Sequence, residues 1–376
     1  MFIKKCEESD FQTIIKIADK AFKPERAAGF SFKKSKPQIY NNPNKNYADI
    51  HFLAYNEKNQ PVAVVGNLID KITVNKNSYK FSRLGTVGTI PDYRGQSYMK
   101  SLMTAANQED LENEVVFSVL TGNRERYNHY KYERIGLTAN YEFNKNQTKY
   151  LKQNQNISIK PFKEEYLETI YNIYRKNELF VLRDIFEFKL SLNNSHTKLY
   201  VICDSDKIVG YFALKNRSII EFNVISSKYI EPTICQILLD EKLTTKEHNY
   251  TIKFIETLLH KHNCYIFDKL ADFKTLSEHM CLKIYNFEKF VEMIVYLNNL
   301  ENLLKSFSET YEVEGQVYTF DFDGKIFKML KSKKQPLCSF ETKEEFVRFM
   351  LGNELLYNNI SEAFPLAFDI NIADRF

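Results

Sequence analysis

Apolar positions between residues 84 and 106 follow first the pattern of a strand and then that of a helix. Residues 84–89 combine strand-forming and small side chains, and Ile90-Pro91 closes the run before a polar turn at 94–97. The next apolar residues recur at i, i+3, i+4 and i+7, the spacing of one helix face: Met99, Leu102, Met103 and Ala106. The pattern predicts a strand, a tight loop and a helix, in that order.

A second pattern is a repeat, in which a set of apolar and polar residues recurs 156 positions later. The first set is Ile3, Lys4, Glu8, Phe11, Thr13, Ile14 and Ile17, and the second is Ile159, Lys160, Glu164, Leu167, Thr169, Ile170 and Ile173. Each set predicts a strand followed by a helix, and a hairpin signal follows each, at Asn59-Gln60 and at Asp206-Lys207. Chance can match seven positions in a chain rich in Ile and Lys, but the shared order of elements favours two related domains.

The chain after Phe290 predicts a third, smaller unit. Residues 293–307 carry an apolar stripe typical of a helix, residues 317–329 alternate around an Asp323-Gly324 turn, and Thr342 with Glu345 forms a capping box before a further helix. We expect three domains, at 1–150, 151–290 and 291–376. The expected fold class is α/β and α+β, with two mixed-sheet domains followed by a small α+β domain.

Composition limits the functions that this chain can have. Its 376 residues are 44% hydrophobic and carry a formal net charge of +4, without the dense basic stripe typical of nucleic-acid-binding proteins. No apolar run approaches the ~20 residues of a membrane helix, and the charged N-terminus is unlike a secretory signal. Six scattered cysteines fit reduced thiols. We expect a cytoplasmic protein that binds neither nucleic acid nor a membrane.

The loop before the predicted helix is a candidate anion site. Backbone N–H groups at a helix N-terminus, together with the helix dipole, suit a pyrophosphate. Gly95 allows close approach of the backbone, and Arg94 adds a positive charge. The same residues also fit a plain turn before a surface helix, so the loop alone does not decide between the two interpretations.

The run Val87-x-Thr89-x-Pro91-x-Tyr93-Arg94-Gly95-Gln96 strongly resembles the acetyl-coenzyme-A motif of the GNAT superfamily of acetyltransferases, Arg-x-x-Gly-x-Gly/Ala. Ser97 and Met99 replace the two later small residues of that motif. The resemblance implies acetyl-coenzyme A as co-substrate, with the thioester carbonyl polarised by strand N–H groups near Val87 and Thr89. The binding residues that it implies are Val87, Gly88, Thr89, Arg94, Gly95, Gln96, Ser97, Tyr98 and Met99.

A second element, Arg126 to Tyr132, resembles the GNAT sequence Tyr-x-x-x-Gly-Phe/Tyr, with Lys131 in place of Gly. In that family the first Tyr faces the thioester sulfur, so the resemblance assigns this role to Tyr127. A phenol with an ordinary pKa of about 10 is protonated at neutral pH and can donate a proton to a leaving thiolate. The alternative is that Tyr127, Tyr130 and Tyr132 are packing aromatics.

The whole layout resembles the enhanced-intracellular-survival family of bacterial acetyltransferases. That resemblance implies a catalytic GNAT domain, a degenerate GNAT-like domain that does not bind coenzyme A, a sterol-carrier-like C-terminal domain and a homo-oligomer, a hexamer in the family. It also implies that the carboxylate of Phe376 helps to take the proton from the amine. Phe364, Leu366, Phe368, Ile370 and Ile372 alternate before it like a strand, so Phe376 is equally well interpreted as an apolar anchor.

The sequence favours transfer of acetyl to a primary amine of a small molecule or lysine by direct attack. Two alternatives stay open: a lipid or small-ligand carrier with the GNAT halves as scaffold, and an acyl-coenzyme-A sensor. His260, His262 and Cys264 alternate as metal ligands can, but a polar helix end explains them better. We therefore expect no metal.

Overall fold

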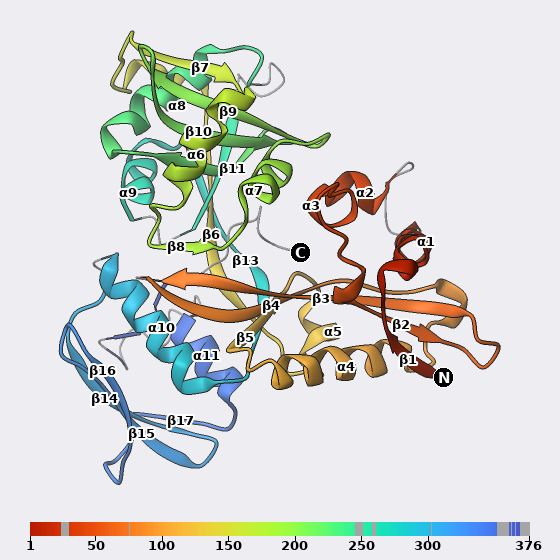
Figure 1. The fold of residues 1–376 in the computed structure, drawn as a ribbon. Helices are drawn as coiled ribbons and strands as arrows, with labels where there is room; N and C mark the ends of the chain where they lie inside the picture. The colour runs from red at the N-terminus through yellow and green to blue at the C-terminus, as the bar shows by residue number, and fades with distance from the viewer. Residues whose placement is uncertain are drawn as a thin grey trace.

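The computed structural model describes the chain except for residues 24–29, 75, 245–250, 258–260, 302, 352–360, 362, 365 and 369–376, and for five further side chains at 137, 257, 261, 262 and 279. One 13-stranded sheet runs through two halves of the chain, and a separate 4-stranded sheet belongs to the C-terminal unit (Figure 1). Among the described residues, no helix is both long and apolar enough to span a bilayer.

The first half is an antiparallel meander that ends in a parallel pair of strands. Its strands are β1 (Phe2–Lys5), β2 (His51–Tyr55), β3 (Pro61–Val74), β4 (Asn77–Thr89) and β5 (Phe117–Leu120). Its helices are α1 (Phe11–Phe22), α2 (Phe32–Ser35), α3 (Pro37–Tyr40), α4 (Tyr98–Glu112) and α5 (Arg124–Asn128). β1 to β4 pair antiparallel, whereas β4 and β5 pair parallel. A parallel pair needs a crossover, and α4 supplies it.

The two faces of this sheet are covered by different helices, because strand side chains alternate between faces. Leu53 packs with the apolar residues of α1, whereas its neighbours Phe52 and Ala54 pack with those of α4. The predicted strand, loop and helix at 84–106 are confirmed as β4, a short connection and α4.

The second half repeats this order of elements. Its strands are β7 (Ile157–Pro161), β8 (Leu179–Val181), β9 (Thr197–Asp204), β10 (Lys207–Lys215), β11 (Ser218–Val224) and β12 (Ile252–Thr257), and its helices are α6 (Leu167–Tyr174), α7 (Ile185–Leu192), α8 (Ile230–Leu239) and α9 (Lys261–Leu270). β7, β9, β10 and β11 pair antiparallel in turn, and β11 with β12 is parallel. Both hairpins that the repeat predicted are present, as β2–β3 and β9–β10.

Two long strands join the halves. β6 (Glu133–Phe143) follows the first half in the chain, and β13 (Phe273–Ile284) follows the second. The sheet order at its centre is β5-β13-β6-β12, so β13 completes the sheet of the first half and β6 that of the second. β8 also crosses over and pairs with β3. The sheet is therefore continuous across residue 150, the expected boundary between the first two domains.

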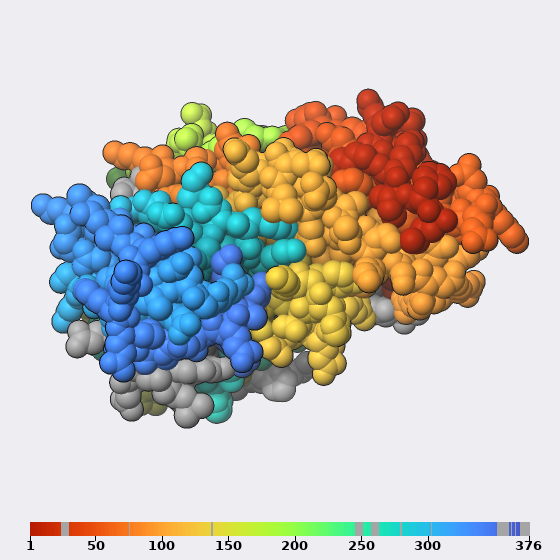
Figure 2. Space-filling view, turned by 90° about the horizontal axis from the view of Figure 1, so that it is seen from below, coloured from red at the N-terminus to blue at the C-terminus, as the bar shows by residue number. Residues whose placement is uncertain are grey.

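The C-terminal unit packs against the first half. It consists of α10 (Phe287–Leu300), β14 (Phe307–Val313), β15 (Gln316–Phe322), β16 (Phe327–Lys331), β17 (Ser339–Phe340) and α11 (Lys343–Leu351). An aromatic core around Tyr311, Phe320 and Phe346 merges with Phe81 and Phe117 of the first half. Figure 2 shows the unit, in blue, side by side with the orange and yellow first half.

Two expectations for this unit need correction. The helix expected at 293–307 is α10, which begins at Phe287 and ends at Leu300, because the Asn286 side chain accepts a hydrogen bond from the Lys289 N–H and so caps the helix earlier. The strand expected from Phe364 onward is not formed over its described residues. Phe364, Leu366 and Phe368 are buried in the aromatic core without strand pairing.

Candidate active site

The strands β4 and β5 separate at the centre of the first half. Their parallel pairing runs from Phe81 opposite Phe117 to Leu84 opposite Leu120, where β5 ends. β4 continues to Thr89 without this neighbour. A bulge lies at the same point, because Val64 pairs with Gly88 while Gly66 pairs with Gly85. The separation and the bulge together turn the backbone at 85–89 towards an opening, a place where bulges commonly redirect groups into a site.

Thr86, within the bulge, is held in a left-handed conformation with φ +53°. Its hydroxyl contacts the hydroxyl of Tyr40, which also lies 2.9 Å from His51 Nε2. His51 Nδ1 lies 2.8 Å from the carbonyl of Tyr47, and a carbonyl only accepts, so Nδ1 donates and Nε2 accepts from Tyr40. Burial lowers the pKa of His51 to about 3, so the imidazole is neutral and supports the bulge without a charge.

The N-terminus of α4 faces the same opening. Gly95 has φ +79° and Ser97 has φ +64°, so the chain makes two left-handed turns just before the helix. The first turn of α4 has no acidic residue, and no side chain caps it. Its backbone N–H groups are therefore available to an anion. Ser97, which replaces a small residue of the GNAT motif, keeps a conformation that glycine adopts readily.

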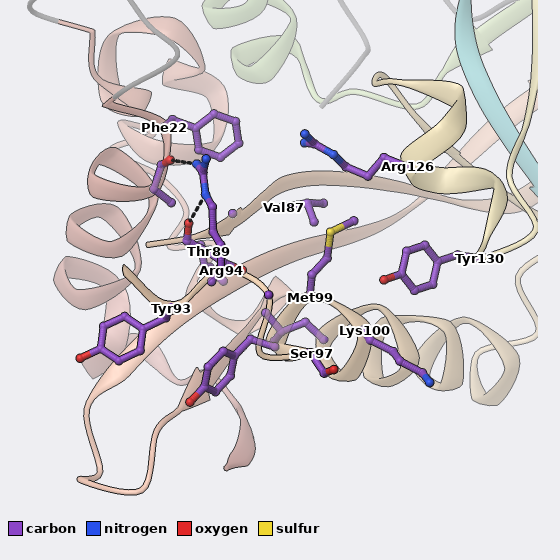
Figure 3. Close-up of a pocket in the computed structure, with 16 residues that line it drawn as sticks. Phe22, Val87, Thr89, Tyr93, Arg94, Ser97, Met99, Lys100, Arg126 and Tyr130 are labelled. Atoms are coloured by element: carbon purple, nitrogen blue, oxygen red, sulfur yellow. Dashed lines mark hydrogen bonds between the residues drawn. The ribbon is translucent and has the colours of Figure 1, made fainter. Parts of the chain in front are cut away.

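Arg94 connects the loop to α1 and β4. Its Nε donates to the carbonyl of Thr89 at 3.3 Å, and its guanidinium donates to the carbonyl of Ala21 at 3.0 Å (Figure 3). α1 approaches β4 closely here, since a Cβ at Gly88 would lie 2.8 Å from Cβ of Ala21 and 2.9 Å from Cε2 of Phe22. Arg94 thus lines the opening and also fixes its wall.

A first cavity of about 420 Å³ fills this opening. Of the residues that the GNAT resemblance implied, it is lined by Val87, Gly88, Thr89, Arg94, Gly95, Ser97, Tyr98 and Met99. Gln96 does not line it and borders a neighbouring surface hollow instead. The first cavity is also lined by four residues that the motif did not imply: Phe22, Lys100, Arg126 and Tyr130.

A second cavity of about 560 Å³ adjoins the first and shares Phe22, Val87 and Arg126 with it. Figure 3 shows Arg126 reaching over Val87, at this junction. Tyr127 lines the second cavity with only 5% of its surface exposed. Burial raises the pKa of Tyr127, and the nearby Arg126 opposes that shift in part. The phenol therefore stays protonated at neutral pH, as a proton donor must.

The other two tyrosines of the element have different surroundings. Tyr130 lines the first cavity, whereas Tyr132 is fully buried and its hydroxyl donates to Ser118 Oγ at 2.9 Å. Tyr132 is thus a packing residue. Lys131, where the family has Gly, adopts φ +65°, a left-handed conformation that glycine adopts readily.

The helix α5, which carries Tyr127, is held by its N-cap and by an ion pair to the sheet. Asn123 accepts from the Glu125 N–H at 2.9 Å and caps α5. Arg124 forms a two-point ion pair with Glu133 of β6, with one contact of 2.7 Å. These contacts fix α5 against the sheet.

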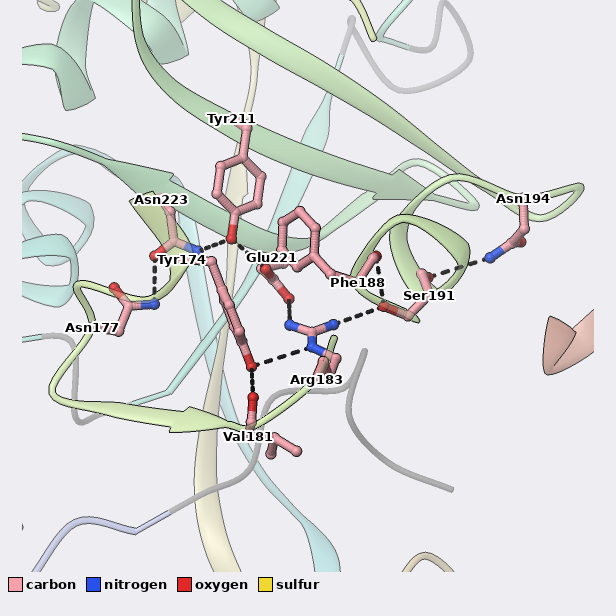
Figure 4. Close-up of polar contacts among 10 residues, drawn as sticks. All are labelled: Tyr174, Asn177, Val181, Arg183, Phe188, Ser191, Asn194, Tyr211, Glu221 and Asn223. Atoms are coloured by element: carbon pink, nitrogen blue, oxygen red, sulfur yellow. Dashed lines mark hydrogen bonds and ion pairs between the residues drawn. The ribbon is translucent and has the colours of Figure 1, made fainter. Parts of the chain in front are cut away.

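The second half has a buried ion pair at the corresponding point. β11 and β12 separate after Ile219, which pairs with Phe254. Two residues further on, Glu221 is buried and forms an ion pair with Arg183 at 3.4 Å (Figure 4). Arg183 also donates to Ser191 at 2.7 Å and to Tyr174 at 3.2 Å. The first turn of α8 carries an acidic residue, Glu231, which disfavours a phosphate there.

Three predicted residues cannot be placed in this geometry. Phe376, His260 and the side chain of His262 lie outside the described residues. Cys264 is buried on α9. Among the described residues, no group of three or more His, Cys, Asp or Glu side chains is arranged to hold a metal ion.

Comparison with known proteins gives a family match for the first half. Residues 2–136 match the acetyltransferase (GNAT) domain family. No curated protein sequence matches the chain.

Solved structures match the fold over nearly its whole length. A probable N-acyltransferase from Enterococcus faecalis is 15% identical with a TM-score of 0.67, covering 98% of this chain and 99% of that one. Eis1 from Mycobacterium abscessus is 12% identical with a TM-score of 0.64, covering 100% of both chains. A GCN5-related N-acetyltransferase from Anabaena variabilis is 14% identical with a TM-score of 0.62, covering 89% of this chain and 86% of that one. Residues 2–136 therefore form a GNAT acetyltransferase domain, and the chain as a whole shares the fold of these solved structures.

Proposed function

We propose that the chain transfers the acetyl group of acetyl-coenzyme A to a primary amine by direct attack. One observation carries this proposal: the cavity at the N-terminus of α4 continues, past Val87 and Arg126, into the cavity that Tyr127 lines. A coenzyme with its phosphates at α4 would direct its thioester towards this junction. An amine in the second cavity would then meet it there.

The residues of the first cavity fit the phosphates of coenzyme A. The N–H groups at the start of α4 and the guanidinium of Arg94 supply donors and positive charge, and Lys100 adds a second cation. Val87 and Thr89, at the bulged end of β4, supply backbone N–H groups that can polarise the thioester carbonyl. The first cavity therefore supports both binding of the coenzyme and activation of its acyl group.

In this reaction the amine nitrogen attacks the thioester carbon, and the carbon–sulfur bond breaks. The attacking nitrogen loses a proton to solvent, and the leaving thiolate takes one from Tyr127, which regains its proton from solvent. The raised pKa of Tyr127 keeps the phenol protonated at neutral pH, so the proton is present when the thiolate leaves. Holding both substrates at one junction supplies the remaining rate enhancement through orientation.

The test is release of the coenzyme A thiol from acetyl-coenzyme A, with and without a panel of primary amines. The proposal predicts thiol release that depends on an amine and gives the acetylated amine in equal amount. Thiol release without an amine product, or none with any amine, would argue against it.

A further inference from the structure

The second cavity is formed jointly by the two halves of the chain. Thr86, Thr121, Gly122 and Tyr127 contribute from the first half, and His196, Lys215 and Asn216 from the second. The two sides also touch directly, since Ser195 Oγ donates to the carbonyl of Lys34 at 3.4 Å. The shape and charge of this cavity therefore depend on residues that lie far apart in the sequence.

The charge of the second cavity is one-sided. Lys36, Arg126 and Lys215 line it, and no Asp or Glu does so among the residues that the structure describes. Two of these cations, Lys36 and Lys215, are absent from the lining of the first cavity. Their charge is therefore not explained by the phosphates of coenzyme A. A cavity that collects positive charge at partly exposed positions attracts an anionic group and repels a polycation.

Lys215 is the most informative of these residues. It is the last residue of β10, and both neighbouring strands fix it, through pairing with Thr197 and Ser218. The following turn has Asn216 at φ +47° and Arg217 at φ +66°. Such a two-residue turn favours Gly at its second position, so Arg217 here costs strain. The chain thus keeps a strained hairpin that brings Lys215 and Asn216 to the cavity.

We propose that the acceptor is a primary amine that also carries an anionic group, and that Lys215 and Arg126 bind that group. The inference rests on the proposed acetyl transfer, because it assigns the second cavity to the acceptor. The anionic group pairs with the cations while the amino group lies towards Val87 and Tyr127, where the acyl group arrives. An amino carboxylate and an amino phosphate share this chemistry.

The test compares amines of matched length with the full chain: 4-aminobutanoate, 4-aminobutanamide and 1,4-diaminobutane, with 3-aminopropyl phosphate to distinguish phosphate from carboxylate. The variant is Lys215→Glu. Its matched control is Lys207→Glu, which changes an exposed lysine at the other end of the same strand, about 26 Å away. Two measurements are made, acetyl transfer and calorimetric binding of each amine to the protein loaded with coenzyme A.

We expect the anionic amines to have the highest kcat/KM and the diamine the lowest. Lys215→Glu should raise KM for 4-aminobutanoate about tenfold, and leave KM for acetyl-coenzyme A and for the amide within about twofold. Lys207→Glu should change none of these values. Added salt should weaken binding of the anionic amines only.

Equal use of the three charge types, or a preference for the diamine, would overturn the inference while acetyl transfer itself stands. Absence of transfer with every amine would count against the proposed function instead. In that case calorimetry tests the inference. It is supported if 4-aminobutanoate binds more tightly than the amide and Lys215→Glu removes the difference. It is overturned if the two bind equally.

Discussion

Gly122 lies so close to Tyr127 that a methyl group at position 122 would overlap the phenol ring at Cε2. The carbonyl of Gly122 accepts a hydrogen bond from Arg134 at 3.1 Å, which holds the glycine backbone in place. The ring of Tyr127 therefore rests on a fixed surface, and its position in the second cavity depends on the absence of a side chain at 122.

Gly122→Ala should displace the Tyr127 ring and lower kcat by about 10²-fold, because a misplacement of ~1 Å can have that effect. Binding of acetyl-coenzyme A should stay unchanged, since Gly122 does not line the first cavity. Steady-state kinetics and calorimetry check both parts. In a Tyr127→Phe background the same substitution should cost little more, and full additivity of the two losses would show that they are independent.

Tyr127→Phe should lower turnover by roughly 10²–10⁴-fold and leave the Kd of acetyl-coenzyme A nearly unchanged. The raised pKa of Tyr127 means that its ionisation should not limit the wild-type rate below about pH 10. Tyr130→Phe is the matched control, because Tyr130 lines the first cavity but is given no part in the proton transfer. Wild-type turnover in the Tyr127 variant would make this residue a packing aromatic.

Asp110 of α4 gives a pH dependence of stability. It accepts hydrogen bonds from Asn67 at 2.9 Å, Ser82 at 2.8 Å and Tyr285 at 2.9 Å. Burial nevertheless raises its pKa from 3.8 to about 6. The folded chain therefore binds this proton more tightly than the unfolded chain does. From well below the unfolded pKa to well above the folded pKa, its contribution to the free energy of unfolding falls by about 3 kcal/mol in total.

Asp110→Asn should remove this slope, because the amide does not titrate. Urea unfolding of both proteins at about pH 4 and about pH 7 measures it: the variant should gain about 2 kcal/mol relative to wild type over that interval. If the free energies of unfolding of the two proteins change by the same amount between the two pH values, the pKa of Asp110 is not raised in the folded chain.

The order of elements could be predicted from the sequence because it depends on local patterns. The repeat located β1 with α1 and β7 with α6, and the spacing of Met99 and Leu102 located α4. The exchange of β6 and β13 could not be predicted in this way. Alternation within a strand indicates which face is buried, but it does not identify the neighbouring strand. Cys281 therefore gave no sign that it would lie opposite Leu120.

For the site too, local features could be predicted from the sequence, whereas contacts between distant segments could not. The loop at 94–97 carries its own signal, in glycine, arginine and the helix that follows. Lys215 has no such sequence signal, because it reaches the second cavity only when a hairpin of the second half packs beside the first half. Gln96 shows that a motif position does not by itself place a residue in the site, because Gln96 lines a separate hollow.

The most direct test of the account is calorimetric titration of the full chain with acetyl-coenzyme A, repeated with Arg94→Ala. We predict one site per chain, since the second half holds the buried Arg183–Glu221 ion pair at the corresponding point and an acidic residue in the first turn of α8. Loss of the Arg94 charge and of its contacts to Ala21 and Thr89 should weaken binding by about 10- to 100-fold. Two equal sites, no binding, or unchanged affinity in the variant would contradict it.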